Sequence, residues 1–369
     1  MRVIMTGGGT GGHIYPAIAI ADEIKKRDPD AKILFVGAER GLEKTLVPKR
    51  GYDIRLITVE GFDRKHLARN VRVVRKLMKG NKQAAEIIRD FRPDFVVGTG
   101  GYASGPMVKA AQKAKIPTFV HEQNAYPGVT NKLLEKGAKA VFLGFARAAE
   151  YFKEQDKLVV SGNPVRDEFR DKDRDEARRV LGFDDDRFVV LAFGGSQGAG
   201  RINKAMTNVI KDLNGRDDIS IVLGAGSYYY DAILKSFREE GFEPADNIRI
   251  IEYIDDMASY LAAADLVISR SGALTVAETT VSGRPAIFIP SPMVTGNHQY
   301  YNALAVAEAG GAIIIEEKDL EDDKLTEEIL RLKVDPQVLD RMAQASRRCG
   351  PDRATEIICD KILEEVKID

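Results

Sequence analysis

The chain has 369 residues, of which 44% are hydrophobic and 30% are charged, and its formal net charge is -1. This composition is typical of a soluble globular protein with two domains, and it excludes a disordered chain or one built of membrane-spanning helices. The balanced charge gives no reason to expect a nucleic-acid partner. The two cysteines, Cys349 and Cys359, form no CxxC pair, which argues for a reducing compartment and against a zinc site.

Short β-branched runs alternate with amphipathic helical stretches, a pattern typical of parallel βαβ units. The sequence begins MRVIMTGGG, a strand that runs into glycines without the apolar stretch of a signal peptide, so we expect no export. The first part of the chain is predicted to contain seven strands, at 2–6, 32–36, 54–59, 94–98, 117–120, 140–144 and 158–162.

A densely charged stretch without a strand-like run follows residue 162, and we interpret it as a linker that leads into a solvated helix. Six further strands are predicted at 187–195, 220–224, 248–254, 266–269, 286–290 and 312–317. We therefore predict an α/β protein with two Rossmann-like, doubly wound parallel-sheet domains, over 1–162 and 163–342. A last helix, over 343–369, could pack back on the first domain.

The first predicted strand ends in the glycine-rich sequence TGGGTGGH (6–13). Gly7, Gly9 and Gly12 have the spacing of the dinucleotide-binding fingerprint, and Glu39 follows the second strand, where a ribose-binding acid is expected. Taken alone, the loop fits a nicotinamide-dependent dehydrogenase or a tight turn that needs glycine. It is not a Walker A loop, because no GK[ST] follows.

His13, one of only four histidines, lies at the start of the helix that follows this loop. The positive end of the helix dipole disfavours a protonated imidazole, so the ring is expected to be neutral and able to accept a proton. His13 is therefore the candidate catalytic base. The alternative is a histidine that only forms hydrogen bonds near the helix end.

Two turns of the same kind occur in the second predicted domain. The sequence FGGSQGAGRINKA (193–205) is again rich in glycine and carries Ser196, and SRSGALTVAE (269–278) places a helix start directly after a strand. Free N–H groups at such a helix start suit a diphosphate. Glu278 lies about a turn and a half into this helix; on its own it is better explained as a solvated acid.

Six motifs, in order, carry a family resemblance: GGGTGGHIYPA, HEQN followed by TNK (121–132), GNPVR, GGSQGA, RSGALTVAE and HQYYNA. Over nearly its whole length the chain resembles the peptidoglycan N-acetylglucosaminyltransferases of glycosyltransferase family 28. The resemblance implies the GT-B fold, in which two Rossmann-like domains face each other across a cleft. It also implies inverting transfer of N-acetylglucosamine from UDP-N-acetylglucosamine to the 4-hydroxyl of undecaprenyl-linked N-acetylmuramyl-pentapeptide (lipid I), which forms lipid II.

The resemblance also implies substrate-binding residues. Sugar and acceptor contacts would come from Thr10, Gly11, Gly12, Asn124 and Arg166. Donor contacts would come from Ser196, Ile254, Ala273, Leu274, Thr275, Val276, Ala277, Glu278 and Gln299. Among these, the backbone of Ile254 would contact the uracil, Glu278 the ribose hydroxyls and Gln299 the N-acetylglucosamine. Some relatives have a glutamine where this chain has His298, so the resemblance assigns His298 no role.

Inverting transfer needs a base for the acceptor hydroxyl and electrostatic stabilisation of the departing diphosphate. His13 would be the base. The amides of 271–275, Ser196 and Arg166 would meet the diphosphate charge, so we expect no metal ion and no other cofactor. The acidic run at 184–186 is interpreted as a solvated turn.

The segment 64–82 carries eight Lys or Arg residues and no acid. Apolar residues recur in it at helical spacing with basic residues beside them, which is the pattern of a helix that lies on a membrane surface. We predict peripheral attachment to the anionic cytoplasmic face of the cell membrane; the alternative is a helix that packs this stripe on the sheet. The predicted contact residues are Leu67, Arg72, Val74, Arg75, Lys76, Leu77, Met78 and Lys79.

Other functions remain open at this point. A related lipid glycosyltransferase, such as a diacylglycerol glucosyltransferase, would have the same fold, although HEQN and HQYYNA favour the peptidoglycan enzyme. Binding of UDP rather than NAD would exclude the dehydrogenase. Binding of UDP without turnover would indicate a non-catalytic sugar-nucleotide-binding module. No motif indicates a partner protein.

Overall fold

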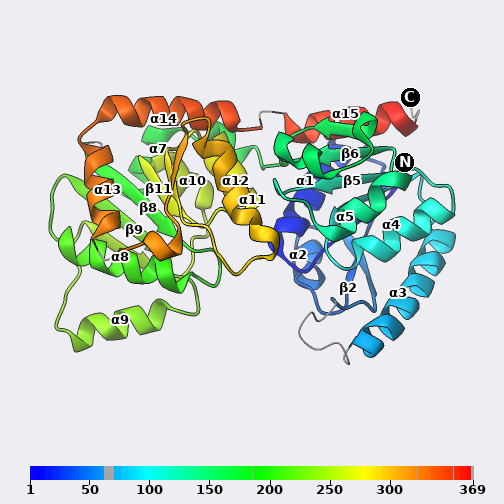
Figure 1. Ribbon diagram of the computed structural model, residues 1–369, viewed down its shortest axis with the longest axis horizontal. Helices are drawn as coiled ribbons and strands as arrows, with labels where there is room; N and C mark the ends of the chain where they lie inside the picture. Colours follow the sequence, from blue (N-terminus) through cyan, green and yellow to red (C-terminus); the bar gives the residue numbers. More distant parts are fainter. Residues whose placement is uncertain (62–69, 185, 322, 352, 367–369) are drawn as a thin grey trace. The chain divides into compact units, whose positions relative to one another are not determined.

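The structure, a computed structural model, consists of two compact units (Figure 1). One unit contains Met1–Val165 together with Arg353–Asp369, and the other contains Arg166–Asp352. Each is built on one parallel sheet. The described residues are 1–61, 70–184, 186–321, 323–351 and 353–366.

The sheet of the first unit has seven parallel strands in the order β3-β2-β1-β4-β5-β6-β7. All seven predicted strands are confirmed, with ends that move by a few residues. The strands are β1 (Arg2–Gly7), β2 (Lys32–Ala38), β3 (Asp53–Ile57), β4 (Phe95–Gly100), β5 (Thr118–Glu122), β6 (Ala140–Leu143) and β7 (Leu158–Val160).

Helices cover both faces of this sheet, because its strands bury side chains on both sides (Figure 1). Val3 and Met5 of β1 pack towards α1, α2 and α15, whereas Ile4 packs towards α3, α4 and α5. The helices are α1 (Gly11–Arg27), α2 (Glu43–Lys49), α3 (Asn70–Phe91), α4 (Ser104–Lys113), α5 (Val129–Leu134) and α15 (Ala354–Val366), with the 3-10 helices η2 (Glu135–Gly137), η3 (Ala146–Tyr151) and η4 (Gln155–Lys157).

The sheet of the second unit has six parallel strands, as predicted, and their order is β10-β9-β8-β11-β12-β13. The strands are β8 (Phe188–Phe193), β9 (Ile219–Gly224), β10 (Ile248–Ile251), β11 (Leu266–Ser269), β12 (Ala286–Phe288) and β13 (Ala312–Ile314). α8, α9, α13 and α14 contribute to one large core, and α10 packs on α7 and β8.

From β8 to β13 the strands and α-helices of the second unit alternate, as βαβ units require, whereas two helices precede β8 and two follow β13. They are α6 (Glu168–Asp171), α7 (Arg174–Leu181), α8 (Gly200–Asp212), α9 (Tyr230–Glu239), α10 (Met257–Ala263), α11 (Ala273–Val281), α12 (His298–Ala307), α13 (Lys324–Lys333) and α14 (Pro336–Cys349), with η5 (Thr295–Asn297) and η6 (Glu317–Asp319).

The chain leaves the first unit after Val165, three residues later than the predicted border at 162. The reason is a tertiary contact that the sequence pattern does not show. Asn163 is buried, and its side-chain amide donates a hydrogen bond to the backbone oxygen of Gln123 at 3.0 Å. The residues just after β7 are therefore part of the first unit.

The single helix predicted over 343–369 is instead two helices, α14 and α15. Pro351 separates them, because proline restricts the residue before it and cannot donate a backbone hydrogen bond. α14 belongs to the second unit and α15 to the first, where Ile358 and Ile362 join the core beside α1.

α7, the helix expected to be solvated, buries one of its charges. Arg178 is only 1% exposed, and its guanidinium lies 2.6 Å from a carboxylate oxygen of Asp265. The same oxygen accepts the backbone N–H of Val189 at 2.8 Å. The buried Arg178 and the half-buried Asp265 therefore join α7 to the start of β8 and to the residue before β11, which the charge pattern alone did not indicate.

Candidate active site

The predicted site residues gather at the carboxyl ends of the strands, near the points where the strand order reverses. In the first sheet the reversal lies between β1 and β4, and in the second it lies between β8 and β11. Loops that leave such neighbouring strands in opposite directions open a crevice, where ligands of doubly wound sheets bind. Each unit therefore contains its own candidate binding surface.

The glycine-rich loop between β1 and α1 is held by Glu43 of α2. This buried carboxylate accepts the backbone N–H of Gly9 at 2.9 Å and that of Ala38 at 2.7 Å. Gly9 has a φ of +88°, which favours glycine. A Cβ atom on Gly8 would lie 2.1 Å from the carboxylate, so glycine is also needed there for the close approach.

His13 lies half-buried in the first turn of α1 and belongs to a chain of hydrogen bonds. Its Nδ1 is 2.9 Å from Oε1 of Gln123, just after β5. Nε2 of Gln123 is 2.8 Å from Nδ1 of His121, whose Nε2 is 3.2 Å from the backbone oxygen of Gly162. Burial lowers the pKa of His121 to about 4, so this second ring is neutral at pH 7.

Asn124 is held by Glu122, the last residue of β5. One carboxylate oxygen of Glu122 accepts the backbone N–H of Asn124 at 3.0 Å and its side-chain amide at 3.2 Å. The other oxygen accepts the backbone N–H of Gly128 at 2.9 Å and the side chain of Asn131 at 2.8 Å. Four donors on one buried carboxylate give the loop after β5 a defined shape.

In the second unit, Ser196 and the start of α11 occupy the loops after β8 and β11, which are neighbouring strands. Ser196 is exposed in a loop that turns at Gly198, where φ is +81°. α11 has nine residues, and its N-cap is Gly272. The first amides of a helix have no partner within the helix, so Ala273, Leu274 and Thr275 can present N–H groups to an anion.

Glu278 is half-buried on α11, and burial raises its pKa to about 7. Arg166 opposes this rise and Glu168 adds to it. The Arg166 guanidinium lies 2.6 Å from a carboxylate oxygen of Glu168 and over the ring of Phe169, 5.0 Å from its centre. Arg166, which the resemblance assigned to the sugar and acceptor contacts, therefore lies within electrostatic range of Glu278.

Ile254 and Gln299 also lie at this end of the second sheet. Ile254 follows β10, is buried, and packs so closely on Gly224 that a Cβ there would lie 2.8 Å from its side chain. Gln299 is in the first turn of α12, where its Oε1 accepts the backbone N–H of Ser291 at 2.9 Å. Its backbone oxygen accepts the hydroxyl of Ser271 at 2.8 Å, which ties α12 to the loop before α11.

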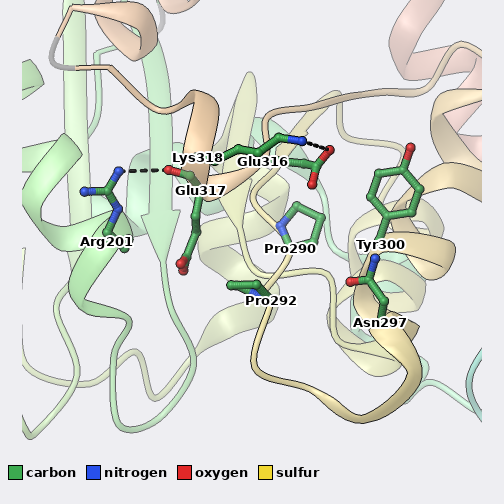
Figure 2. A pocket seen from close by; sticks show the side chains of 8 residues that line it. All are labelled: Arg201, Pro290, Pro292, Asn297, Tyr300, Glu316, Glu317 and Lys318. Atoms are coloured by element: carbon green, nitrogen blue, oxygen red, sulfur yellow. Dashed lines mark hydrogen bonds and ion pairs between the residues drawn. The ribbon is translucent and has the colours of Figure 1, made fainter.

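A pocket of about 320 Å³ in the second unit contains none of the predicted site residues (Figure 2). The guanidinium of Arg201 donates to the backbone oxygen of Glu317 at 2.8 Å, and Lys318 lies 3.3 Å from Glu316. The walls of the pocket come from separate segments, and the two lining residues that lie in motifs, Arg201 and Tyr300, were assigned no role from the sequence. The lining residues are Arg201, Pro290, Pro292, Asn297, Tyr300, Glu316, Glu317 and Lys318.

The structure thus brings Thr10, Gly11, Gly12 and His13 together with the loop of Asn124, through the His13–Gln123 contact. In the second unit, the side chains of Val276 and Ala277, which the resemblance assigned to the donor contacts, are buried in α11. The side chains that support these loops were not predicted as site residues. They are Glu43, His121, Glu122 and Gln123.

Among the described residues, no group of three or more His, Cys, Asp or Glu side chains is arranged to hold a metal ion. In the same part of the chain, no helix combines the length and the hydrophobicity that crossing a membrane requires.

The predicted membrane helix is partly described. Leu67 lies outside the described residues, and so does the side chain of Arg72. Val74 and Met78 are 46% and 68% exposed, Arg75 and Lys79 are exposed, and Leu77 and Lys76 are half-buried. Lys76 forms an ion pair with Glu60.

Comparison with known proteins identifies the family. The N-terminal domain of glycosyltransferase family 28 matches residues 3–143, and the C-terminal domain of the same family matches residues 189–357. The crystal structure of MurG from Acinetobacter baumannii has a TM-score of 0.78 and 28% identity to this chain, and the match covers 98% of this chain and 99% of that one.

Curated relatives match along the whole chain. A protein of Acetivibrio thermocellus is 46% identical over 100% of this chain and 99% of its own length, and one of Clostridioides difficile is 43% identical over 99% and 89%. Both are named UDP-N-acetylglucosamine–N-acetylmuramyl-(pentapeptide) pyrophosphoryl-undecaprenol N-acetylglucosamine transferase. With both domain matches and these relatives, the chain belongs to glycosyltransferase family 28 and has its two-domain GT-B fold.

Proposed function

We propose that this protein is an inverting hexosyltransferase that moves N-acetylglucosamine from UDP-N-acetylglucosamine to the 4-hydroxyl of the N-acetylmuramyl-pentapeptide of lipid I. The product is lipid II, a precursor of peptidoglycan. The names of the relatives support the reaction and both substrates. The structural observation that carries the proposal is the start of α11, where helix amides are followed by the half-buried carboxyl of Glu278.

The second unit binds the donor. The amides of Ala273, Leu274 and Thr275, with Ser196 on the neighbouring loop, hold the diphosphate, because a helix start attracts negative charge. Glu278 accepts hydrogen bonds from the two ribose hydroxyls, and the backbone at Ile254 contacts the uracil. Gln299, whose oxygen accepts the Ser291 amide, contacts the N-acetylglucosamine through its side chain.

The first unit supplies the base and binds the acceptor. Nε2 of His13 takes the proton of the acceptor 4-hydroxyl as its oxygen bonds to the anomeric carbon of the donor sugar. The bond between that carbon and the phosphate oxygen breaks, and UDP leaves with the electron pair. Attack on the face opposite the leaving group inverts the anomeric centre. Thr10, Gly11, Gly12 and Asn124 position the acceptor.

The departing diphosphate gains its stabilisation from the chain itself. Helix amides at α11, the Ser196 hydroxyl and the Arg166 guanidinium lie in the second unit and carry positive or partly positive charge. These groups do the work that a divalent cation does in other sugar transferases. The proposal therefore needs no metal and no other cofactor.

We further propose that the protein attaches to the anionic cytoplasmic face of the cell membrane through α3. The support is the exposure of Val74 and Met78, one turn apart, beside the exposed Arg75 and Lys79. Val73, one residue away, is buried in the core instead. Each basic residue near an anionic leaflet adds about 1 kcal/mol, and salt screens it, so attachment should be reversible.

Vesicle co-sedimentation tests this attachment. Changing Arg75 and Lys79 to Glu should reduce binding to anionic vesicles at low salt and leave donor binding unchanged. The matched control changes the exposed Lys26 and Lys49 to Glu, because α1 and α2 cover the other face of the sheet. Equal sedimentation of the α3 variant and wild type would refute the proposal.

A competition assay tests the reaction. Purified protein is given UDP-N-acetylglucosamine with a lipid I analogue and diacylglycerol together, and products are separated by mass spectrometry. We expect one N-acetylhexosamine to be added to the lipid I analogue alone. Transfer to diacylglycerol would instead assign the protein to the related lipid glycosyltransferases, and no transfer to either acceptor would refute the enzymatic proposal.

A further inference from the structure

Two backbone oxygens determine the direction of the hydrogen bonds that end at His13. A carbonyl oxygen only accepts, so Nε2 of His121, 3.2 Å from the oxygen of Gly162, must carry a hydrogen. For the same reason the Gln123 atom 3.1 Å from the backbone oxygen of His121 must be the amide nitrogen. The two assignments are independent, because they concern different side chains.

The contact between these two side chains agrees with both assignments. The nitrogen of Gln123 also lies 2.8 Å from Nδ1 of His121. His121 is fully buried and neutral at pH 7, so its ring has a single N–H, already placed on Nε2. Nδ1 is therefore an acceptor, and the Gln123 amide nitrogen donates to it.

The same orientation of Gln123 determines which ring nitrogen of His13 carries the hydrogen. With its nitrogen turned to His121, Gln123 presents Oε1 to Nδ1 of His13 at 2.9 Å. An amide oxygen only accepts, so Nδ1 of His13 must donate. The neutral ring then has a lone pair on Nε2, for which the described residues provide no hydrogen-bond partner.

We infer that Gln123 and His121 are positioning residues that hold the neutral His13 ring with its hydrogen on Nδ1 and its lone pair on Nε2. The inference rests on the proposed role of His13 as the base, and it names the atom that accepts the proton. Gly162, at the end of this series of hydrogen bonds away from His13, supplies one of the two carbonyl oxygens that determine the arrangement.

The surroundings of the ring hold it in this orientation. Gly100 has a φ of +105°, and a Cβ atom on it would lie 2.8 Å from Nδ1 of His13. The hydroxyl of Thr99 donates to the backbone oxygen of His13 at 2.7 Å. Because the partner of the ring is an amide and not a carboxylate, it selects the tautomer without adding a negative charge beside the imidazole.

Nitrogen-15 NMR of the ring nitrogens tests the inference on the wild-type protein, without any substrate. The chain has four histidines, so selective labelling gives few signals, and the spectrum of His13→Ala identifies those of His13. At about pH 8 we expect the neutral His13 ring to be protonated on Nδ1. A His13 ring protonated mainly on Nε2 would overturn the inference, whether or not the protein transfers sugar.

Steady-state kinetics of Gln123→Met test whether Gln123 positions His13 for turnover. This change keeps the length of the side chain and removes its hydrogen bonds to His13 and His121, so kcat should fall about 10- to 100-fold while both KM values stay within about threefold. The control is Gln112→Met in the same unit, which removes hydrogen bonds to Leu134 and Thr118 and should leave kcat unchanged.

The outcomes are distinct. An unchanged kcat in Gln123→Met, or a raised KM with an unchanged kcat, would overturn the positioning role. If Gln123→Met fails to fold, as shown by circular dichroism, the wild-type NMR result decides alone. If the wild type has the expected tautomer but transfers no sugar, the assignment of the hydrogen stands and the proposed function fails.

Discussion

Glu278→Gln should weaken binding of UDP-N-acetylglucosamine in a way that depends on pH. In the proposed donor site the carboxylate accepts two ribose hydroxyls, and hydrogen bonds to a charged group contribute about 1.5–3 kcal/mol, so loss of the charge should weaken binding about 10- to 100-fold at pH 8. Because the pKa of Glu278 is raised to about 7, the carboxyl is largely ionised at that pH.

The sign of the pH effect follows from the same pKa. Below pH 7 the carboxyl of the free protein becomes protonated, so donor affinity should fall by up to about tenfold per pH unit in the wild type. Glu278→Gln has no such group, and its affinity should be nearly flat. The difference in donor affinity between wild type and Glu278→Gln should therefore become smaller as the pH falls towards 6.

Isothermal titration calorimetry from about pH 6 to pH 8 measures the donor affinity of both proteins. The ligand itself adds no pH dependence, because the diphosphate of a UDP-sugar has no terminal phosphate that titrates in this range. Glu239→Gln is the control, because Glu239 is an exposed carboxylate on α9 of the same unit. Parallel pH profiles for wild type and Glu278→Gln would refute the assignment of Glu278 to the ribose.

The free protein should show the opposite trend in stability. A carboxyl whose pKa is higher in the folded than in the unfolded state stabilises the fold at low pH, and this contribution is lost as the pH rises through 7. Glu278→Gln should therefore raise the free energy of unfolding near pH 8, by at most about 3 kcal/mol and by less where water reaches the half-buried carboxyl. Urea denaturation without ligand measures it, and a less stable variant would contradict the reasoning.

Three further outcomes follow from the site. His13→Ala should lower kcat about 100-fold or more while UDP affinity stays within a few-fold, and a kcat close to wild type would show that the base lies elsewhere. Glu43→Gln should lower the free energy of unfolding by about 1–3 kcal/mol in urea denaturation, because the amides of Gly9 and Ala38 lose a charged acceptor; unchanged stability would contradict this. EDTA should leave turnover unchanged, and activity that EDTA abolishes and magnesium restores would refute the metal-free mechanism.

The fold was predictable because the strands are buried on both faces and read as short apolar runs between amphipathic helices. The border between the two units, after Val165, was not predictable, because it depends on the tertiary hydrogen bond of Asn163 to the loop after β5. The pair of the buried Arg178 and the half-buried Asp265 was not predictable for a similar reason. Its partners lie on separate elements, and a charged helix segment looks solvated in the sequence.

The candidate site was predictable where one segment carries the signal and not where distant segments meet. The glycine loops and His13 stand out in the sequence, whereas Glu43 looks like an ordinary acid in the first turn of a helix. Its role appears only when α2 packs against the loop. Gln123 lies in a family motif, but its function depends on two partners, of which His13 is 110 residues away.

The most direct test of the central claim is to follow one reaction by proton NMR, with UDP-N-acetylglucosamine as the donor and a lipid I analogue as the acceptor. The account predicts that UDP forms in equal amount to a β-linked disaccharide, and that neither appears without the acceptor. An α-linked product, or UDP released with free sugar in the absence of acceptor, would contradict it.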